Sequence, residues 1–141
     1  MRGTIVFDGR CGFCTRLIGW LSRLDRRRQV TVRPYQGHGV LAATGVRREQ
    51  ASSSVWWLGA DGRLARGAEA VNAALSAALG TRLPLAVYRP TRWLQERAYG
   101  WVAANRHRLP GVTPYCTAHP EECEAPRPVN EGGDDAVTAT M

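Results

Sequence analysis

The spacing of apolar side chains predicts a short strand and then an amphipathic helix at the start of the chain. Thr4 to Phe7 is an apolar run of strand character, and the Asp8-Gly9 turn ends it. From about Cys11 on, apolar residues recur at helical spacing and place one face on Cys14, Leu17, Ile18, Leu21 and Leu24. The arginines at 26–28 then put cations where the helix dipole is negative, which favours a helix end there.

The pattern over the next residues predicts a second strand and a weaker helix. Valines alternate with polar residues over 29–33, which is typical of a strand, and Pro34 ends it. Residues 39–46 have a weak helical pattern. We expect the serine-rich stretch 52–54 to be a polar connection.

A hairpin and a helix are predicted after this connection. Residues 55–58 have the composition of a strand, residues 60–63 supply turn chemistry, and 64–66 form the returning strand. Gly67 then opens a helix that reaches Leu79, with apolar residues on one face. The predicted order of elements is that of a thioredoxin-like α/β fold, a sheet flanked by helices.

The C-terminal third predicts a helical extension and an acidic tail. Residues 84–109 form a helical region, and we expect its large side chains to be packed, namely Trp93, Leu94, Tyr99, Trp101 and Val102. Residues 1–116 are therefore expected to form one domain. Residues 117–141 are acidic, contain proline and glycine, and are expected to be a disordered tail.

Charge and hydropathy limit the classes of function that fit this sequence. The formal net charge of +7 comes from arginine alone, and the tail carries six acids against one arginine, so the first 116 residues stand at +12. These arginines are scattered and no nucleic-acid-binding signature accompanies them, which argues against a nucleic-acid partner. No stretch is apolar enough for a signal peptide or a membrane span, and a cytoplasmic protein is expected. In such a protein, four cysteines indicate redox or metal chemistry rather than structural disulfides.

Cys11 and Cys14 form a CxxC pair at the expected start of the first helix. The N-terminus of a helix carries roughly half a positive charge and unpaired N–H groups, which stabilise a thiolate on the first cysteine. Cys11 is therefore the expected nucleophile and the more exposed thiol. Cys14 begins the apolar face, one turn further on, and is expected to be the more buried, resolving thiol.

Asp8 ends the first strand, close to this pair, and has two roles that do not exclude each other. Its carboxylate could relay a proton between Cys14 and water. It could also accept N–H bonds from the turn and the helix start, as aspartate commonly does.

A second cluster of potential ligands, near the end of the chain, is compatible with functions other than a redox enzyme. Cys116, His119 and Cys123 offer thiolates and an imidazole, which suit zinc, alone or together with the CxxC. Cys116 and Cys123 could instead be a second dithiol that exchanges with the first, or have no role. The alternatives to a redox enzyme are thus a zinc-binding module and a redox-silent interaction domain.

The segment Val6-Phe7-Asp8-Gly9-Arg10-Cys11-Gly12-Phe13-Cys14 resembles the defining motif of the DCC family of thiol–disulfide oxidoreductases, also described as a domain of unknown function (DUF393). The Asp, Cys and Cys of the family name fall on Asp8, Cys11 and Cys14. The similarity continues through 61–71 and 99–109 and covers about residues 4 to 116.

The resemblance implies a protein-disulfide reductase type of activity with Asp8, Cys11 and Cys14 as site residues and no bound cofactor. Its partners would be a disulfide-containing protein or small-molecule thiol substrate and a dithiol electron donor. Thioredoxins carry a cis-proline before the third strand, whereas residues 50–54 here hold no proline. We expect a serine of this stretch to take over part of that proline's role in binding substrate.

Overall fold

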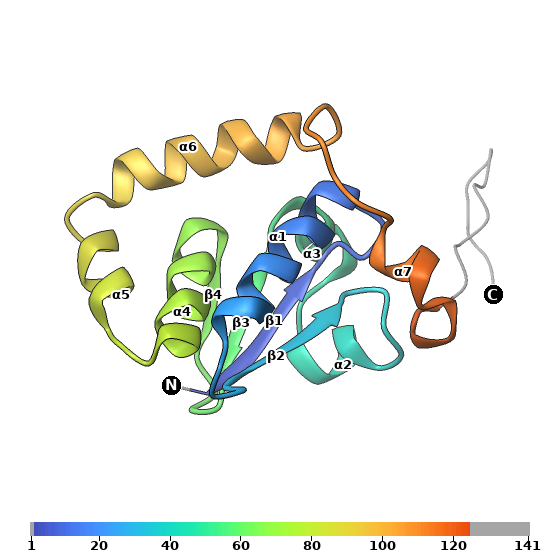
Figure 1. Ribbon diagram of the computed structural model, residues 1–141, viewed down its shortest axis with the longest axis horizontal. Helices are drawn as coiled ribbons and strands as arrows, with labels where there is room; N and C mark the ends of the chain where they lie inside the picture. The colour runs from blue at the N-terminus through green and yellow to red at the C-terminus, as the bar shows by residue number, and fades with distance from the viewer. Residues whose placement is uncertain (1, 125–141) are drawn as a thin grey trace.

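A four-stranded sheet forms the centre of the protein in a computed structural model that describes residues 2–124 (Figure 1). The strands are β1 (Gly3–Phe7), β2 (Val30–Pro34), β3 (Trp56–Gly59) and β4 (Leu64–Arg66), in the order β2-β1-β3-β4. β1 pairs in parallel with β2 and antiparallel with β3, and β3 pairs antiparallel with β4. The sheet order and strand directions confirm the predicted thioredoxin-like α/β fold.

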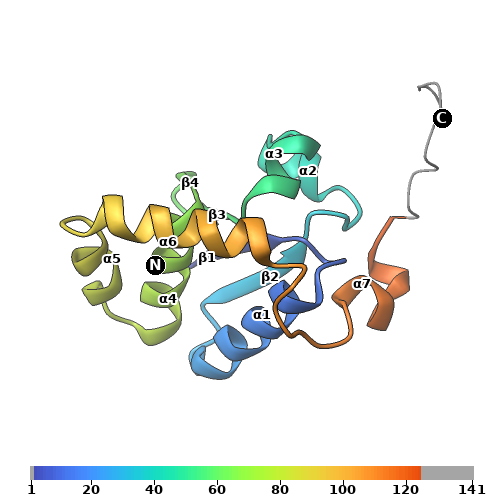
Figure 2. The same cartoon turned by 90° about the horizontal axis from the view of Figure 1, so that it is seen from above.

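Two helices cover one face of the sheet and form the core with it. These are α1 (Gly12–Leu24) and α4 (Gly67–Leu79), and both lie below the sheet in Figure 2. Small side chains let α4 approach closely. Its buried alanines pack against β1, β3 and α1 in a cluster of Ile5, Phe7, Ile18, Leu21, Trp57, Ala70, Ala74, Ala77 and Ala78. β1 is thereby fixed in the middle of the fold, and its C-terminal end presents Asp8.

The other face of the sheet is covered by two short helices, α2 (Val40–Thr44) and α3 (Arg48–Ser53) (Figure 2). The prediction that residues 52–54 form a polar connection is wrong for Ser52 and Ser53, because α3 continues through both. Both serine hydroxyls donate to backbone carbonyls three residues earlier, at 3.0 Å each. These local bonds satisfy the hydroxyls within a helix, and buried Ala51 holds α3 against the protein.

The C-terminal helical region is confirmed as α5 (Leu83–Tyr88) and α6 (Arg92–Asn105), and α6 lies across the ends of α1 and α4 in Figure 1. The expectation that its large side chains are packed is wrong for three of them. Trp93 is 67% exposed, Leu94 53% and Trp101 62%. Polar contacts hold α6 instead. Its inner face carries Gln95, Glu96 and Tyr99, Arg106 follows at its C-terminal end, and all four side chains hydrogen-bond to the body.

The chain ends, as far as the structure describes it, in α7 (Tyr115–Ala118) and the 3-10 turn η1 (Pro120–Glu122). A disulfide joins Cys116 to Cys123, and Cys123 also forms a β-bridge with Gly37. Residues 117–124 of the expected tail therefore lie against the body, while the remainder of that tail falls outside the described residues. None of the helices within 2–124 has the length and apolar character needed to cross a bilayer.

Candidate active site

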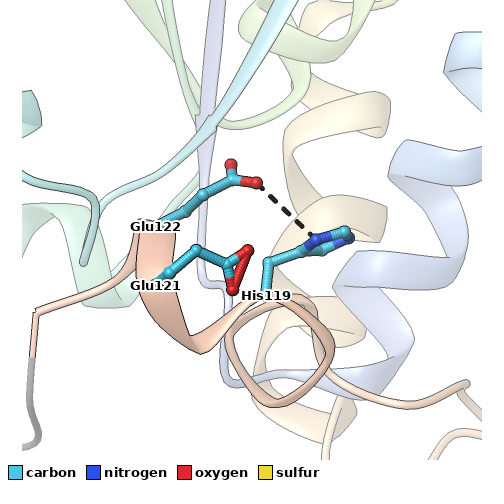
Figure 3. A group of neighbouring side chains, drawn as sticks. All are labelled: His119, Glu121 and Glu122. Atoms are coloured by element: carbon cyan, nitrogen blue, oxygen red, sulfur yellow. Dashed lines mark ion pairs between the residues drawn. The ribbon is translucent and has the colours of Figure 1, made fainter.

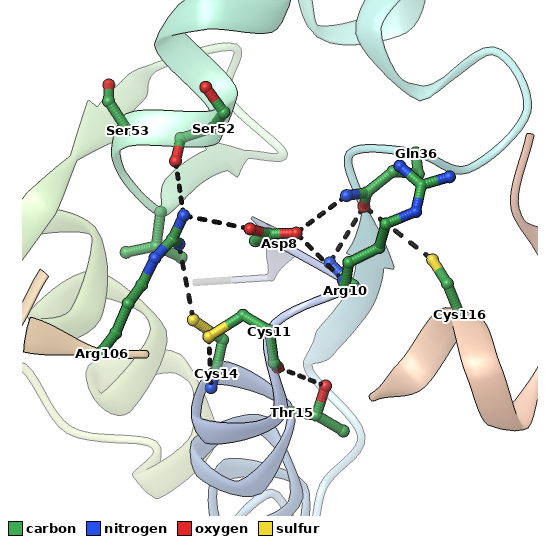
Figure 4. Close-up of polar contacts among 12 residues, drawn as sticks. Asp8, Arg10, Cys11, Cys14, Thr15, Gln36, Ser52, Ser53, Arg106 and Cys116 are labelled. Carbon is green, nitrogen blue, oxygen red and sulfur yellow. Dashed lines mark hydrogen bonds and ion pairs between the residues drawn. The ribbon is translucent and has the colours of Figure 1, made fainter. Parts of the chain in front are cut away.

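The turn after β1 brings both thiols of the CxxC to the N-terminus of α1 (Figure 4). Cys11 is the N-cap residue, and its Sγ accepts the backbone N–H of Cys14 at 3.2 Å. Its own N–H donates to the Asp8 carbonyl at 3.1 Å, and its carbonyl accepts the Thr15 hydroxyl at 2.9 Å. Neither thiol is in a disulfide. The helix N-terminus thus donates a hydrogen bond to the sulfur of Cys11.

The relative exposure of the two thiols is the reverse of what the sequence predicts. Cys11 is 3% exposed, whereas Cys14 is only partly buried. The expectation that Cys11 is the more open thiol is therefore wrong. Cys11 is buried by a later part of the chain, and local sequence patterns do not predict where that part lies.

Residues 110–116, here called the crossing segment, lie over the turn and the first turn of α1. Val112 donates its N–H to the Gly12 carbonyl at 3.2 Å, and Cys116 donates to the Gly9 carbonyl at 2.8 Å. A side chain at Gly12 would put its Cβ 2.5 Å from the Val112 carbonyl oxygen, so glycine is needed for this close approach. Gly9 and Gly12, which flank Arg10 and Cys11, are both hydrogen-bonded to the crossing segment. The segment therefore helps to bury Cys11.

Arg106 is a site residue that the reading of sequence patterns did not single out. It follows α6, and its guanidinium reaches three partners at the dithiol (Figure 4). Nη2 lies 3.0 Å from Asp8 Oδ2 and donates to the Ser52 carbonyl at 2.9 Å, while Nη1 lies 3.7 Å from Cys14 Sγ. The one available signal was its place in the stretch 99–109 that resembles the family.

The surroundings of Cys14 disfavour its thiolate. Burial raises the pKa of the Cys14 thiol, and the hydrogen bond and negative charge of Cys11 raise it further. Arg106 acts in the opposite direction, since its positive charge and its hydrogen bond lower the pKa. Arg106 is thus the group at the site that favours ionisation of Cys14.

The carboxylate of Asp8 is held by N–H donors on both sides. Oδ1 accepts the Arg10 backbone N–H at 3.0 Å and Gln36 Nε2 at 2.8 Å. Gln36 is 1% exposed, and its Oε1 accepts the Gly9 N–H at 3.0 Å, so it fixes both the carboxylate and the turn. With Arg106 on Oδ2, the carboxylate is anchored between the turn and α6.

Comparison with protein families matches residues 5–112 to the DCC1-like thiol-disulfide oxidoreductases. The chain belongs to this family. The match spans most of the described chain and includes the CxxC, Asp8 and Arg106, and it confirms the resemblance seen in the sequence. Comparisons with curated proteins and with solved structures found no match.

The second cluster of this DCC1-like chain is a disulfide and an exposed acidic group. Cys116 and Cys123 are bonded to each other, so neither offers a thiolate to zinc, and the zinc site drawn from these residues does not fit this structure. His119 Nδ1 pairs with Glu122 at 3.6 Å, and Glu121 lies beside them (Figure 3). All three side chains are on the surface, where such groups are common without a metal.

The stretch before β3 lacks the thioredoxin proline geometry in this family member. No cis peptide bond occurs within the described residues. The Ser52 carbonyl is occupied by Arg106, while Ser53 and Ser54 line a cavity next to Cys14. The expected substrate-binding role of a serine in this stretch stays a prediction.

Proposed function

We propose that the protein is a dithiol–disulfide oxidoreductase in which Cys11 is the nucleophile and Cys14 the resolving thiol. The observation that carries this proposal is the sulfur of Cys11 at the N-terminus of α1, accepting the N–H of Cys14. Because the thiolate is the reactive form, this sulfur is the better nucleophile of the two, even though it is the more buried. Cys14, whose pKa is raised by burial, is suited to act second.

The exchange takes two steps. The Cys11 thiolate attacks one sulfur of a substrate disulfide, the substrate S–S bond breaks, and the other half leaves as a thiolate that takes up a proton. Cys14 then loses its proton and attacks Cys11 Sγ, which releases the second half and leaves a Cys11–Cys14 disulfide. Two electrons pass to the substrate, and a dithiol donor restores the pair by the reverse exchange.

Arg106 and Asp8 act on the second step in this mechanism. The Arg106 guanidinium stabilises the Cys14 thiolate as it forms, since it already lies 3.7 Å from that sulfur. Asp8 positions Arg106 through their ion pair. Asp8 and Cys14 line the same cavity, so a water there could carry the proton from the thiol to the carboxylate.

Trapping of the mixed disulfide tests the assigned roles. Cys14→Ser incubated with glutathione disulfide should accumulate one glutathione on Cys11, located by mass spectrometry of peptides. Cys11→Ser, the matched control, should accumulate none on Cys14 within the same time. A glutathione found on Cys14 in the control would reverse the roles.

Turnover of a glutathione mixed disulfide in the presence of dithiothreitol tests the activity itself. We expect turnover by the parent protein and its loss in Cys11→Ser, whereas Cys14→Ser should keep only the turnover that dithiothreitol supports by attacking the mixed disulfide on Cys11 directly. Absence of turnover by a folded parent protein would instead support the redox-silent interaction domain.

A further inference from the structure

An apolar cavity of about 290 Å³ lies next to the dithiol, between α1, α4 and α6. Apart from the residues at one end, its walls are aliphatic and aromatic, among them Phe13, Leu17, Val71 and Val102. The space is open to solvent on one side, and a concave, largely apolar pocket with a few polar groups at one end is typical of a ligand site.

The cavity exists because α6 is held above it by polar contacts. Tyr99 accepts the Val55 N–H at 2.8 Å, and Arg106 donates to the Ser52 carbonyl at 2.9 Å. Between these two anchors, α6 offers only Val102 and Ala103 to the cavity, and α4 offers Val71, Ala74 and Leu75. These side chains do not fill the space beneath the helix.

The polar end of the cavity is the redox site. Asp8, Cys14 and Arg106 line it there. Cys11, which is 3% exposed, is not among the lining residues, but its Sγ accepts the N–H of Cys14 at 3.2 Å (Figure 4). Leu17, 39% exposed, and Trp20, 48% exposed, border the cavity on the side of α1, where it meets solvent. The cavity therefore opens to solvent beside α1 and reaches Cys14 at its polar end, while the crossing segment lies over the outer side of the turn.

We propose that this cavity binds an apolar group carried by the substrate close to its disulfide sulfur, so that the enzyme selects disulfides bearing an aromatic or branched aliphatic group. The inference rests on the proposed function and names its substrate class. The apolar group enters between α1 and α6, and its sulfur reaches the dithiol at the polar end. Exchange then follows the two steps above, with dithiothreitol as the reductant in the assay.

Two mixed disulfides of glutathione, one with benzyl thiol and one with 2-mercaptoethanol, undergo the same exchange but differ in the apolar group. Comparing their kcat/KM values therefore measures the contribution of that group. Burial of a benzyl group should raise kcat/KM by at least about tenfold over the hydroxyethyl compound. Ala103→Phe fills the cavity, and we expect the ratio of the two kcat/KM values to fall towards one, through a higher KM for the benzyl compound. Ala104→Phe, on the exposed side of α6, is the matched control and should keep the parent ratio. Ala103→Leu gives the intermediate ratio if the larger substitution does not fold.

Binding of S-benzylglutathione, a thioether that cannot exchange, is the readout that does not depend on activity. It should change the tryptophan fluorescence of the parent and of Ala104→Phe, since Trp20 lines the cavity, and should bind Ala103→Phe at least about tenfold more weakly. Thioether binding without turnover of either disulfide would contradict the proposed function and support the site. Equal kcat/KM for the two disulfides, or a preference that survives Ala103→Phe and Ala103→Leu, would overturn the site.

Discussion

Removal of the Arg106 guanidinium should weaken both the fold and the second step of exchange. In Arg106→Gln, Asp8 loses an ion-pair partner at 3.0 Å, and the side chains of Arg106 and Asp8 are only 17% and 11% exposed. Loss of one partner of a buried pair costs about 3–5 kcal/mol. Asp8 keeps its bonds to Arg10 and Gln36, so we expect the free energy of unfolding to fall by about 2–3 kcal/mol.

A double-mutant cycle isolates the pair from the other contacts of the guanidinium. Asp8→Asn alone should lower the free energy of unfolding by about 1–2 kcal/mol, and the double variant should lose about 2 kcal/mol less than the sum of the single variants. Urea unfolding followed by circular dichroism gives these values. Arg108→Gln, an exposed neighbour, is the control and should stay within about 0.5 kcal/mol of the parent.

Arg106→Gln should also change the kinetics of exchange in a way that a purely structural role of Arg106 would not produce. Because Arg106 lowers the pKa of Cys14, its loss should raise that pKa. Release of the second substrate half, followed by stopped-flow, should then be slower at neutral pH and should need a higher pH to reach its maximum. A coupling energy near zero together with an unchanged pH profile of release would refute the assigned position of Arg106 in the mechanism.

Three further predictions follow from separate parts of the structure. Asp8→Asn should slow the attack of Cys14 several-fold in stopped-flow, and unchanged kinetics would leave Asp8 a structural residue. Cys123→Ser opens a disulfide of sequence separation 7 and should lower the free energy of unfolding in urea by roughly 2 kcal/mol; a larger loss would mean that the packing of Cys123 outweighs loop closure. Burial and the Glu96 carboxylate raise the pKa of Tyr88 from 10.0 to about 12, so its contribution to stability is complete below pH 10 and lost towards pH 12. Tyr88→Phe should flatten the decline of stability in this range, and parallel curves for parent and variant would contradict this.

The parts of the fold governed by local spacing could be predicted from the sequence. The strand before Asp8, the helix after Cys11 and the helix that Gly67 opens all follow from apolar periodicity and turn residues, and each is present near its expected bounds. α3 could not be predicted, because serines disfavour helices unless their hydroxyls find a carbonyl, and that depends on the helix already being formed.

The unpredicted parts of the site depend on contacts between distant residues. Arg106 reaches Cys14 across 92 residues of sequence, and no periodic pattern relates the two. The burial of Cys11 depends on an irregular segment with glycine and proline, whose path is set by hydrogen bonds to the turn rather than by its own preferences. The exposed tryptophans of α6 differ from expectation for a similar reason, since polar anchors and not apolar packing orient that helix.

The crossing segment also sets an order of events during synthesis. Tyr115, in this segment, donates its N–H to the hydroxyl of Thr15, which lies 100 residues earlier in the sequence. At typical rates of synthesis the ribosome therefore needs roughly 5–20 s to reach Tyr115 after it has added Thr15. Throughout this interval Cys11 lacks the cover that the crossing segment provides. The nascent chain is therefore the form in which Cys11 meets cellular oxidants most freely, and once the cover has formed, access from that side requires local opening of the chain.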